Sequence, residues 1–385
     1  MRHKLLYILT VILLCGVTVS CSKDKHEHIA GETVIMFFPY SGLENYIEEN
    51  ITCMKEAIVK RGGLGNTRLI VYQSTSLSNG LLYEIEYDQG RCQNRIISDV
   101  SATFQSRDQQ SNIVQMESVF NKIKSTAPAA SYSMIIGSHG NAWVQAGNTL
   151  ATKGQKAFGS GTRSYQIDNT SLATALKNCG IHLTYLLFDA CYMASVEAVY
   201  DFRNTCSYYI ASQNEILLYG IPYDHVGDAL LKHDYKTVVD NYYDFYSNYS
   251  IGTEKYPYGS LSVISTANLE NFTYIIKELN RNLSPDADLR KVQFMDGIQP
   301  HIFFDMKDYY RNYCTDAKLY ETFDAVLGAI VMYERHTDEF FTAYADYSPY
   351  HFPTIYSCGL NISQPTTNDN VAALLRQTEW WQATH

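Results

Sequence analysis

Two short apolar segments of the chain end in residues that could act as a nucleophile and as its base. The segment SYSMIIGSHG (131–140) carries His139 and Gly140 at its end, and LTYLLFDAC (183–191) ends in Cys191. Apolar runs of this kind are typical of buried strands in a parallel sheet, and ligands bind beyond the carboxyl ends of such strands. If the two strands are neighbours, the imidazole and the thiol meet in one crevice, which is the outline of a cysteine-nucleophile active site.

The residues around Cys191 indicate how its thiol could be activated. A thiol attacks a carbonyl as the thiolate, and a nearby imidazole is the usual means of generating it. The pattern of residues 192–200 predicts a helix, whose amino terminus would lower the pKa of the Cys191 thiol. The N–H groups there, including that of Cys191, would bind the developing oxyanion together with the N–H of Gly140. Considered alone, His139 is more simply explained as a turn residue and Cys191 as a buried thiol. The catalytic interpretation therefore depends on their matching positions at the ends of two strands. No third member of a catalytic triad is evident.

Composition limits the classes of protein to which the chain can belong. With 385 residues, 46% hydrophobic and 18% charged, it can form one large α/β core and a smaller subdomain. The net charge is −10 and the pI is near 5.5, and no run of Lys and Arg is present. These features argue against a nucleic-acid partner.

The amino terminus has the features of an export signal. Basic residues at 2–4 precede an apolar stretch at 5–19 that is too short for a comfortable membrane span. The sequence TVSC then resembles a bacterial lipoprotein box, which predicts a signal peptide at 1–20, lipidation of Cys21 and a polar tether at 21–32. The alternative is ordinary signal cleavage near Ser20. We expect an exported protein held by its lipid at a membrane of a bacterial envelope or at the cell surface.

The remaining cysteines do not suggest a metal site. They include no CxxC pair and no Cys/His cluster, and the chain has no DxDxDG-type loop, so we expect no cofactor and infer no metal. Export permits disulfides, but an odd number of cysteines leaves at least one thiol free. We expect Cys191 to be a free thiol. Cys179 and Cys206 are expected to fill space in the core. The seven cysteines beyond the amino-terminal segment are Cys53, Cys92, Cys179, Cys191, Cys206, Cys314 and Cys358.

Strand and helix patterns alternate in the manner of a parallel sheet covered on both faces. We expect a core at 33–282, with a short hairpin around 82–87, and a helical subdomain at 283–385 packed on the core, including a helix at 318–335. Six segments read as strands: 34–38, 68–72, 131–140, 183–191, 208–212 and 260–265. Five read as helices: 43–60, 111–124, 168–178, 192–200 and 267–281.

Several segments together resemble the clostripain-like cysteine peptidases of the caspase and gingipain group. They are SHG (138–140), DAC (189–191), ASQNEILLYGIPY (211–223), FFDMKDYY (303–310) and CGLNISQP (358–365). The order and approximate spacing match, Cys191 follows His139 by 52 residues as in caspases, and the likeness covers nearly the whole mature chain. The resemblance implies a caspase-like α/β/α sandwich with a mostly parallel sheet, a dyad of His139 and Cys191, and hydrolysis of peptide bonds after Arg or Lys.

Within that resemblance, Asp189 is the candidate for recognising the substrate. It lies two residues before Cys191 on one strand, so its side chain points to the same side of the sheet and could pair with an Arg or Lys side chain. The alternative is a cap for the helix expected after Cys191. Relatives that select basic residues often carry a second acid shortly before the GxPY segment, where this chain has Tyr219. Glu215 could take its place, or could equally be solvated.

The loop at 141–167 suggests self-activation. It is rich in Gly, Ser, Thr and Ala, and it carries Lys153, Lys156 and Arg163 beside the expected active site. Exposed polar loops are preferred sites of nicking, and the resemblance implies processing in this region. We expect intramolecular cleavage after Lys153, with Lys156 or Arg163 as further sites; the alternative is a surface loop with incidental basic residues.

Two other functions stay open at this point. The chain could be a non-catalytic surface lipoprotein that binds a peptide or a glycan. The same dyad could also serve another thiol-dependent acyl transfer, such as amidase or transpeptidase chemistry. The sequence does not predict an oligomeric state.

Overall fold

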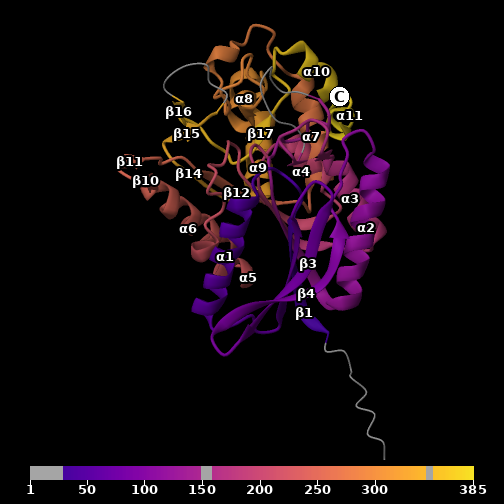
Figure 1. The fold of residues 1–385 in the computed structure, drawn as a ribbon. Helices are drawn as coiled ribbons and strands as arrows, with labels where there is room; N and C mark the ends of the chain where they lie inside the picture. The colour runs from indigo at the N-terminus through magenta and orange to yellow at the C-terminus, as the bar shows by residue number, and fades with distance from the viewer. Residues whose placement is uncertain (1–28, 149–157, 344–349) are drawn as a thin grey trace, which may run out of the picture.

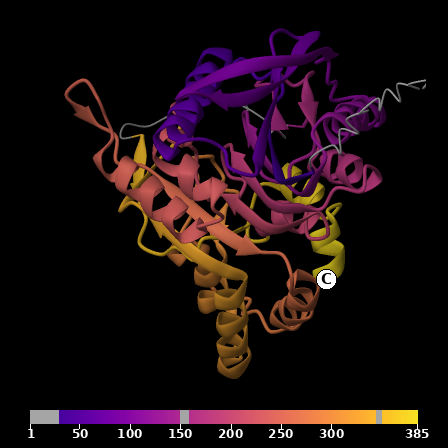
Figure 2. The same cartoon turned by 90° about the horizontal axis from the view of Figure 1, so that it is seen from below.

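A nine-stranded sheet forms the centre of the protein. The computed structural model describes residues 29–148, 158–343 and 350–385. The strands lie in the order β14-β12-β9-β8-β5-β1-β2-β3-β4, and the five from β9 to β2 are parallel. They are β1 (Ala30–Phe38), β2 (Thr67–Ser74), β3 (Asn79–Asp88), β4 (Arg91–Ser101), β5 (Ala129–Gly137), β8 (Leu183–Asp189), β9 (Cys206–Ala211), β12 (Ser260–Ser265) and β14 (Val331–His336). Figure 2 shows the amino-terminal strands at one edge and the orange carboxyl-terminal strands toward the other.

Helices cover both faces of this sheet (Figure 1). In β8, Leu187 belongs to one buried cluster and its neighbours Leu186 and Phe188 to the other, because successive side chains of a strand point to opposite faces. Burial on both faces explains the continuous apolar runs of the sequence. One face packs on α1 (Glu44–Arg61), α5 (Tyr223–Leu231) and α6 (Tyr235–Asn248); the other packs on α2 (Gln109–Thr126), α3 (Asn169–Asn178), α4 (Val196–Asp201), α7 (Leu269–Arg281) and α9 (Ala317–Ile330).

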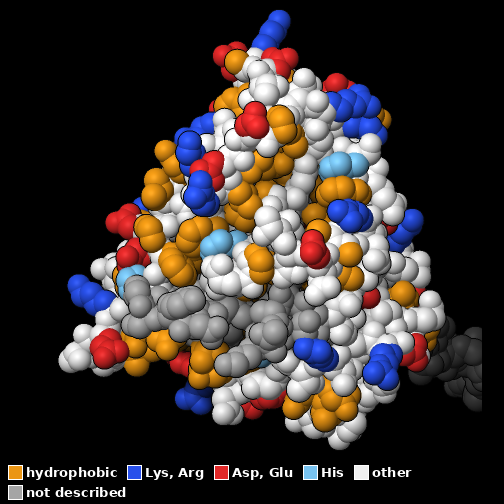
Figure 3. Space-filling model, turned by 90° about the horizontal axis from the view of Figure 1, so that it is seen from above, with side chains coloured by type: hydrophobic (Ala, Val, Ile, Leu, Met, Phe, Trp, Pro, Cys, Tyr) orange, Lys and Arg blue, Asp and Glu red, His pale blue; other side chains and the backbone are white. Residues whose placement is uncertain are grey.

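The carboxyl-terminal region lies at the end of the molecule where the parallel strands finish, shown in orange and yellow in Figure 1. It contains α8 (Met306–Tyr313), α10 (Asp369–Leu375), α11 (Glu379–Thr384), a 3-10 turn at Leu289–Lys291 and the short strands β13 (Phe304–Asp305), β15 (Glu339–Phe341), β16 (His351–Pro353) and β17 (Asn361–Ile362). Two further small ladders pair β6 (Phe158–Gly159) with β7 (Gln166–Ile167) and β10 (Ser250–Ile251) with β11 (Glu254–Lys255). Seen from above, Lys and Arg side chains are scattered over this end of the molecule (Figure 3).

The six predicted strands are present, and the mixed α/β class with a mostly parallel sheet is confirmed. One direction differs, because β12 runs antiparallel to β9. A single crossover helix would have kept the strands parallel, whereas the pair α5 and α6 returns the chain to the end at which β9 finished. The hairpin expected around 82–87 is longer, since β3 and β4 together extend the sheet beyond β2.

The predicted helix at 318–335 is wrong in its last part. The helix α9 ends at Ile330, and Val331–His336 form β14, which pairs antiparallel with β12 at the sheet edge. The β-branched and aromatic residues Val331 and Tyr333 favour this strand over the helical continuation. The boundary expected at residue 282 therefore does not divide the sheet, because the carboxyl-terminal region supplies one of its strands.

The helices were also considered as possible membrane-spanning segments by their length and apolar character. Within residues 29–148, 158–343 and 350–385, none is both long enough and apolar enough to cross a bilayer.

Candidate active site

Adjacent strands β5 and β8 bring His139 and Cys191 to one cleft. They pair in parallel with Gly137 opposite Asp189, and Ser138 N donates a hydrogen bond to Asp189 O (3.2 Å). Two residues further along each chain, His139 and Cys191 both line one cleft. The structure thus brings together the imidazole and the thiol that the sequence placed at matching strand ends.

Gly140 allows the chain after His139 to approach the Cys191 backbone. A Cβ atom at Gly140 would lie 2.5 Å from Cys191 O and 2.7 Å from Cys191 N. In the part of the chain that the structure describes, no other residue accepts a hydrogen bond from the N–H groups of Gly140 or Cys191. These two neighbouring N–H groups are available as donors to an oxygen atom, as an oxyanion hole requires.

The helix expected directly after Cys191 begins later. α4 starts at Val196, and its N-cap is Ser195, whose side chain accepts a hydrogen bond from Ala198 N. Ser195 is a good N-cap residue, and the apolar residues before it are buried as an irregular turn. The expected effect of a helix amino terminus on the Cys191 thiol is therefore wrong, because the helix dipole acts only within its first turn.

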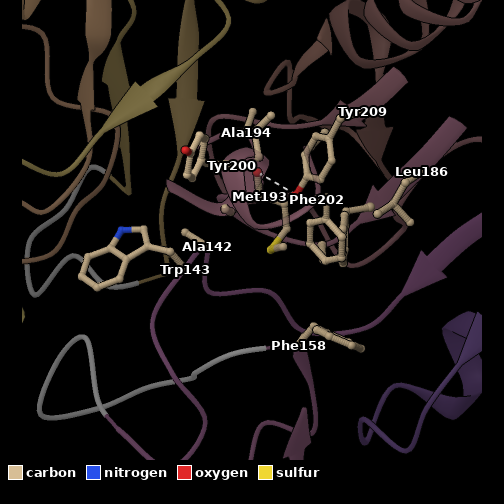
Figure 4. Packing of buried hydrophobic residues seen from close by; sticks show 14 of the residues in the cluster. Ala142, Trp143, Phe158, Leu186, Met193, Ala194, Tyr200, Phe202 and Tyr209 are labelled. Carbon is tan, nitrogen blue, oxygen red and sulfur yellow. Dashed lines mark hydrogen bonds between the residues drawn. The ribbon is translucent and has the colours of Figure 1, made fainter. Parts of the chain in front are cut away.

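The turn after Cys191 is instead fixed by the core. Figure 4 shows Tyr209 pointing its hydroxyl at the Met193 backbone, and Tyr209 OH donates to Met193 O (3.1 Å). Ala194 N donates to Ser212 O (2.9 Å), which ties the turn to the loop that follows β9. Cys191 thus lies between strand β8 and a turn whose residues are buried.

The surroundings of Cys191 favour the neutral thiol. Ile216 N donates a hydrogen bond to the Cys191 Sγ atom (3.4 Å). Burial raises the pKa of the Cys191 thiol to about 12, and the nearby carboxylates of Glu215 and Asp189 add to the increase. A thiol whose pKa is raised in this way needs a base to take its proton at neutral pH.

Asp189 is the one acidic residue among the described residues that line the cleft. It is 6% exposed, and its Oδ2 atom accepts hydrogen bonds from Asn50 Nδ2 (3.2 Å), Ile221 N (3.1 Å) and Tyr223 OH (3.1 Å). Burial raises the pKa of the Asp189 carboxyl to about 6, against the opposing effect of these hydrogen bonds. The carboxylate is ionised above that pH and held in a fixed position. The cap role considered as the alternative is not observed, since Ser195 caps α4.

Gly220 lies directly against this carboxylate. Its φ of +75° is in the left-handed region, and a Cβ atom there would lie 2.8 Å from Asp189 Oδ2 and 3.0 Å from Asn50 Nδ2. Its carbonyl accepts a hydrogen bond from Tyr246 OH (2.5 Å). Both the backbone conformation and the close approach require glycine at this position.

A sequence profile of the clostripain family, peptidase C11, matches residues 40–350. The chain belongs to the clostripain family of cysteine proteases. Its fold is similar to that of a secreted C11 cysteine protease from Bacteroides thetaiotaomicron named iotapain, with 30% identity, a TM-score of 0.83, and coverage of 93% of this chain and 99% of that one.

Two further solved structures resemble this protease. One is a clostripain from Bacteroides thetaiotaomicron in complex with a peptide inhibitor, with 35% identity, a TM-score of 0.54, and coverage of 57% of this chain and 96% of that one. The other is an inactive zymogen C11 protease from Parabacteroides distasonis, with 23% identity, a TM-score of 0.77, and coverage of 93% of this chain and 99% of that one. This similarity shows that the two proteins share a fold. No curated protein gave a significant match.

Glu215 does not lie in the cleft of the protease, nor is it solvated. It is buried, and its carboxylate accepts hydrogen bonds from Tyr192 OH (2.7 Å) and from Ala343 N (3.0 Å to each oxygen). Both expectations for this residue were therefore wrong, because the chain after β9 turns its polar side chains toward the carboxyl-terminal region. Burial raises the pKa of Glu215.

Tyr219, which occupies the position expected for a second acid, also points away from the cleft. Its ring stacks on Phe245 with a centroid distance of 5.0 Å, and its hydroxyl lies 3.8 Å from Cys53 Sγ. The cleft wall in this stretch is formed by Leu217 and Leu218 instead.

Arg163 is exposed in the turn between β6 and β7, while Lys153, Lys156 and Cys21 lie outside the described residues. The hairpin that carries Arg163 contacts the active site, since Gly159 forms a β-bridge with His139 and its N–H donates to Ser138 Oγ (3.1 Å). All seven described cysteines are unpaired in the structure, and Cys179 and Cys206 are buried as expected.

Sequence reasoning missed the partners that hold Asp189. Tyr223 lies within the segment that carries the family resemblance, but Asn50 gives no signal, because it reaches the cleft from α1, more than a hundred residues before Asp189. Such contacts between distant elements are set by packing and not by local pattern.

We predict that Cys191 of the free protease reacts with iodoacetamide at a rate that rises about tenfold per pH unit from pH 6 to pH 10. The thiolate is the reactive form, and a pKa near 12 leaves no plateau in this range. The measurement is the alkylation rate of the Cys191 peptide by mass spectrometry, with Cys191→Ala reporting the reaction of other thiols. A plateau below pH 8 would instead reveal a stable thiolate–imidazolium pair with His139.

Proposed function

We propose that this protein is a cysteine endopeptidase that cleaves peptide bonds after Arg or Lys with Cys191 and His139. The observation that carries the proposal is the buried Asp189 carboxylate in the cleft that Cys191 lines. A buried carboxylate is costly unless it is paired, so a cationic side chain is the ligand that fits it.

In the proposed reaction, the His139 imidazole takes the proton of the Cys191 thiol as the sulfur attacks the substrate carbonyl carbon. The carbonyl oxygen becomes an oxyanion that accepts hydrogen bonds from the N–H groups of Gly140 and Cys191. The tetrahedral intermediate collapses to an acyl-enzyme as the C–N bond breaks and His139 gives its proton to the leaving amine. Water, deprotonated by His139, then releases the new carboxyl group and restores the thiol.

The walls of the cleft suit a long side chain with a charged end. Leu43, Ile47 and Leu217 provide apolar surface for the methylene groups, and Asp189 would pair with the ammonium or guanidinium group. A related clostripain of 35% identity has been crystallised with the peptide inhibitor BTN-VLTK-AOMK, whose peptide portion ends in lysine. That likeness supports the same preference here.

Self-cleavage in the loop 141–167 would activate the enzyme, with Lys153 as the first site and Lys156 or Arg163 as further sites. The support is spatial, since Phe158 and Gly159 follow directly after the segment 149–157, and Gly159 bridges to His139. A basic residue in this loop is therefore tethered close to the residues that would cut it, which raises its effective concentration. The two products would stay joined by the pairing of β5 with β8.

The lipid anchor is proposed from the amino-terminal sequence. A diacylated Cys21 would hold the protease at a membrane surface, while the tether at 21–32 would separate it from the bilayer. The substrates in this proposal are polypeptides outside the cytoplasm.

We predict that Asp189→Asn lowers kcat/KM for a peptide reporter ending in Arg on the order of 10²-fold, because about 2–5 kcal/mol of charge pairing is lost. A reporter ending in citrulline, the neutral isostere of Arg, is the matched control and should change little. In the wild type, the preference for Arg over citrulline should fall as the pH drops through about 6, because protonation removes the Asp189 charge. An unchanged preference in the variant would refute the pocket assignment.

We further predict two associated chains in purified wild-type protein and a single chain in Cys191→Ala. Intact-mass measurement should place the cut after Lys153, and Lys153→Ala should slow the cut or move it to Lys156 or Arg163. The same spectra should show a lipidated Cys21 at the amino terminus of protein extracted from membranes. An uncut wild-type chain with full activity would contradict self-activation.

A further inference from the structure

The residue after the nucleophile has an unusual backbone conformation. Tyr192 has a φ of +61°, in the left-handed region that a bulky side chain seldom adopts. Such a conformation persists only where surrounding contacts hold it, and it occurs often at active sites. The contacts of Tyr192 therefore identify what fixes the direction in which the chain leaves Cys191.

Contacts with the described residues hold Tyr192, which is 1% exposed. Its N–H donates to Asn214 O (3.0 Å), its ring stacks on Phe303 with a centroid distance of 4.7 Å, and its hydroxyl donates to Glu215 Oε1 (2.7 Å). Of these partners, Asn214 and Glu215 belong to the loop that follows β9. The nucleophile turn and this loop are thus held together through Tyr192.

Glu215 connects the same turn to the cleft wall. Its carboxylate also accepts hydrogen bonds from Ala343 N, so it is fixed from the carboxyl-terminal region as well as from Tyr192. The next residue, Ile216, lines the cleft and points its N–H at Cys191 Sγ (3.4 Å). A displacement of Glu215 would therefore move the wall against which the thiol rests.

We propose that Tyr192 and Glu215 form a positioning pair, in which the hydrogen bond between their side chains holds the Cys191 thiol and the Ile216 wall in the arrangement needed for attack. Neither side chain touches the substrate. The proposal rests on the proposed thiol chemistry, and it adds two residues to which no catalytic function has been assigned.

The pair acts on the thiol in two opposite ways. The charges of the Glu215 and Asp189 carboxylates both raise the pKa of the Cys191 thiol, while His139 lines the same cleft after β5. Removing the Glu215 charge should thus ease thiol ionisation while it loosens the wall. A merely structural residue would not combine easier ionisation with slower turnover.

The test compares Tyr192→Phe and Glu215→Gln with the wild type in turnover of an Arg reporter and in the pH profile of Cys191 alkylation. Tyr192→Phe should lower kcat roughly tenfold with KM within about twofold, because a buried acceptor loses its donor and the turn is released. Glu215→Gln should lower kcat similarly but move the alkylation profile to lower pH. The double variant should be no worse than the poorer single variant, as expected for residues that act together.

Tyr310→Phe is the matched control, since it also removes a buried tyrosine hydroxyl. Tyr310 lies on α8 in the carboxyl-terminal region, and its hydroxyl donates to Asn280 Oδ1 on α7 (2.9 Å). Tyr310→Phe should leave kcat and the alkylation profile unchanged, although it should lower thermal stability about as much as Tyr192→Phe does. Unchanged kcat in Tyr192→Phe and an unshifted profile in Glu215→Gln would overturn the positioning pair. If Tyr192→Phe fails to fold, the nearly isosteric Glu215→Gln decides the question.

The proposed function can fail separately from this inference. If the wild type cleaves no basic reporter even after trypsin treatment, the proposed peptidase activity is wrong. The alkylation profiles then decide whether Tyr192 and Glu215 position the thiol, because they need no substrate.

Discussion

The arrangement of the active site depends on the parallel pairing of β5 with β8. The register that sets Gly137 opposite Asp189 also sets His139 beside Cys191, and a slip of one residue would turn these side chains to the opposite face of the sheet. Burial of both strands on both faces holds that register. Gly140 completes the constraint, because only a residue without a Cβ atom can approach the Cys191 backbone so closely.

The positions of the residues that this register brings together could be predicted from the sequence. Parallel buried strands are recognisable as apolar runs, so the strand ends, the meeting of His139 with Cys191 and the position of Asp189 could be inferred. The helix after Cys191 could not be placed correctly, because the same apolar residues fit either a helix or a buried turn, and packing decided between them. Glu215 was misplaced for a related reason, since its partners Tyr192 and Ala343 come from distant parts of the chain.

The cleft combines a rigid frame with a thiol that does not ionise readily. Burial and the nearby Glu215 and Asp189 carboxylates raise the pKa of the Cys191 thiol. Of these two carboxylates, only that of Asp189 lines the cleft among the described residues. A bound cation beside Asp189 would neutralise part of that field. If Asp189 binds the substrate as proposed, substrate binding would also lower the pKa of the Cys191 thiol.

The loop after β9 is completed from the end of the chain. Gln213 exchanges hydrogen bonds with Asn361, whose Nδ2 donates to Gln213 O (2.6 Å), and Ser357 Oγ donates to Gln213 Oε1 (2.6 Å). During synthesis, the strands that carry His139 and Cys191 emerge long before these partners. Because of this order of synthesis, a nascent chain contains His139 and Cys191 well before it contains the residues that complete the loop after β9, so the cleft can take its final form only when the carboxyl-terminal region has been made.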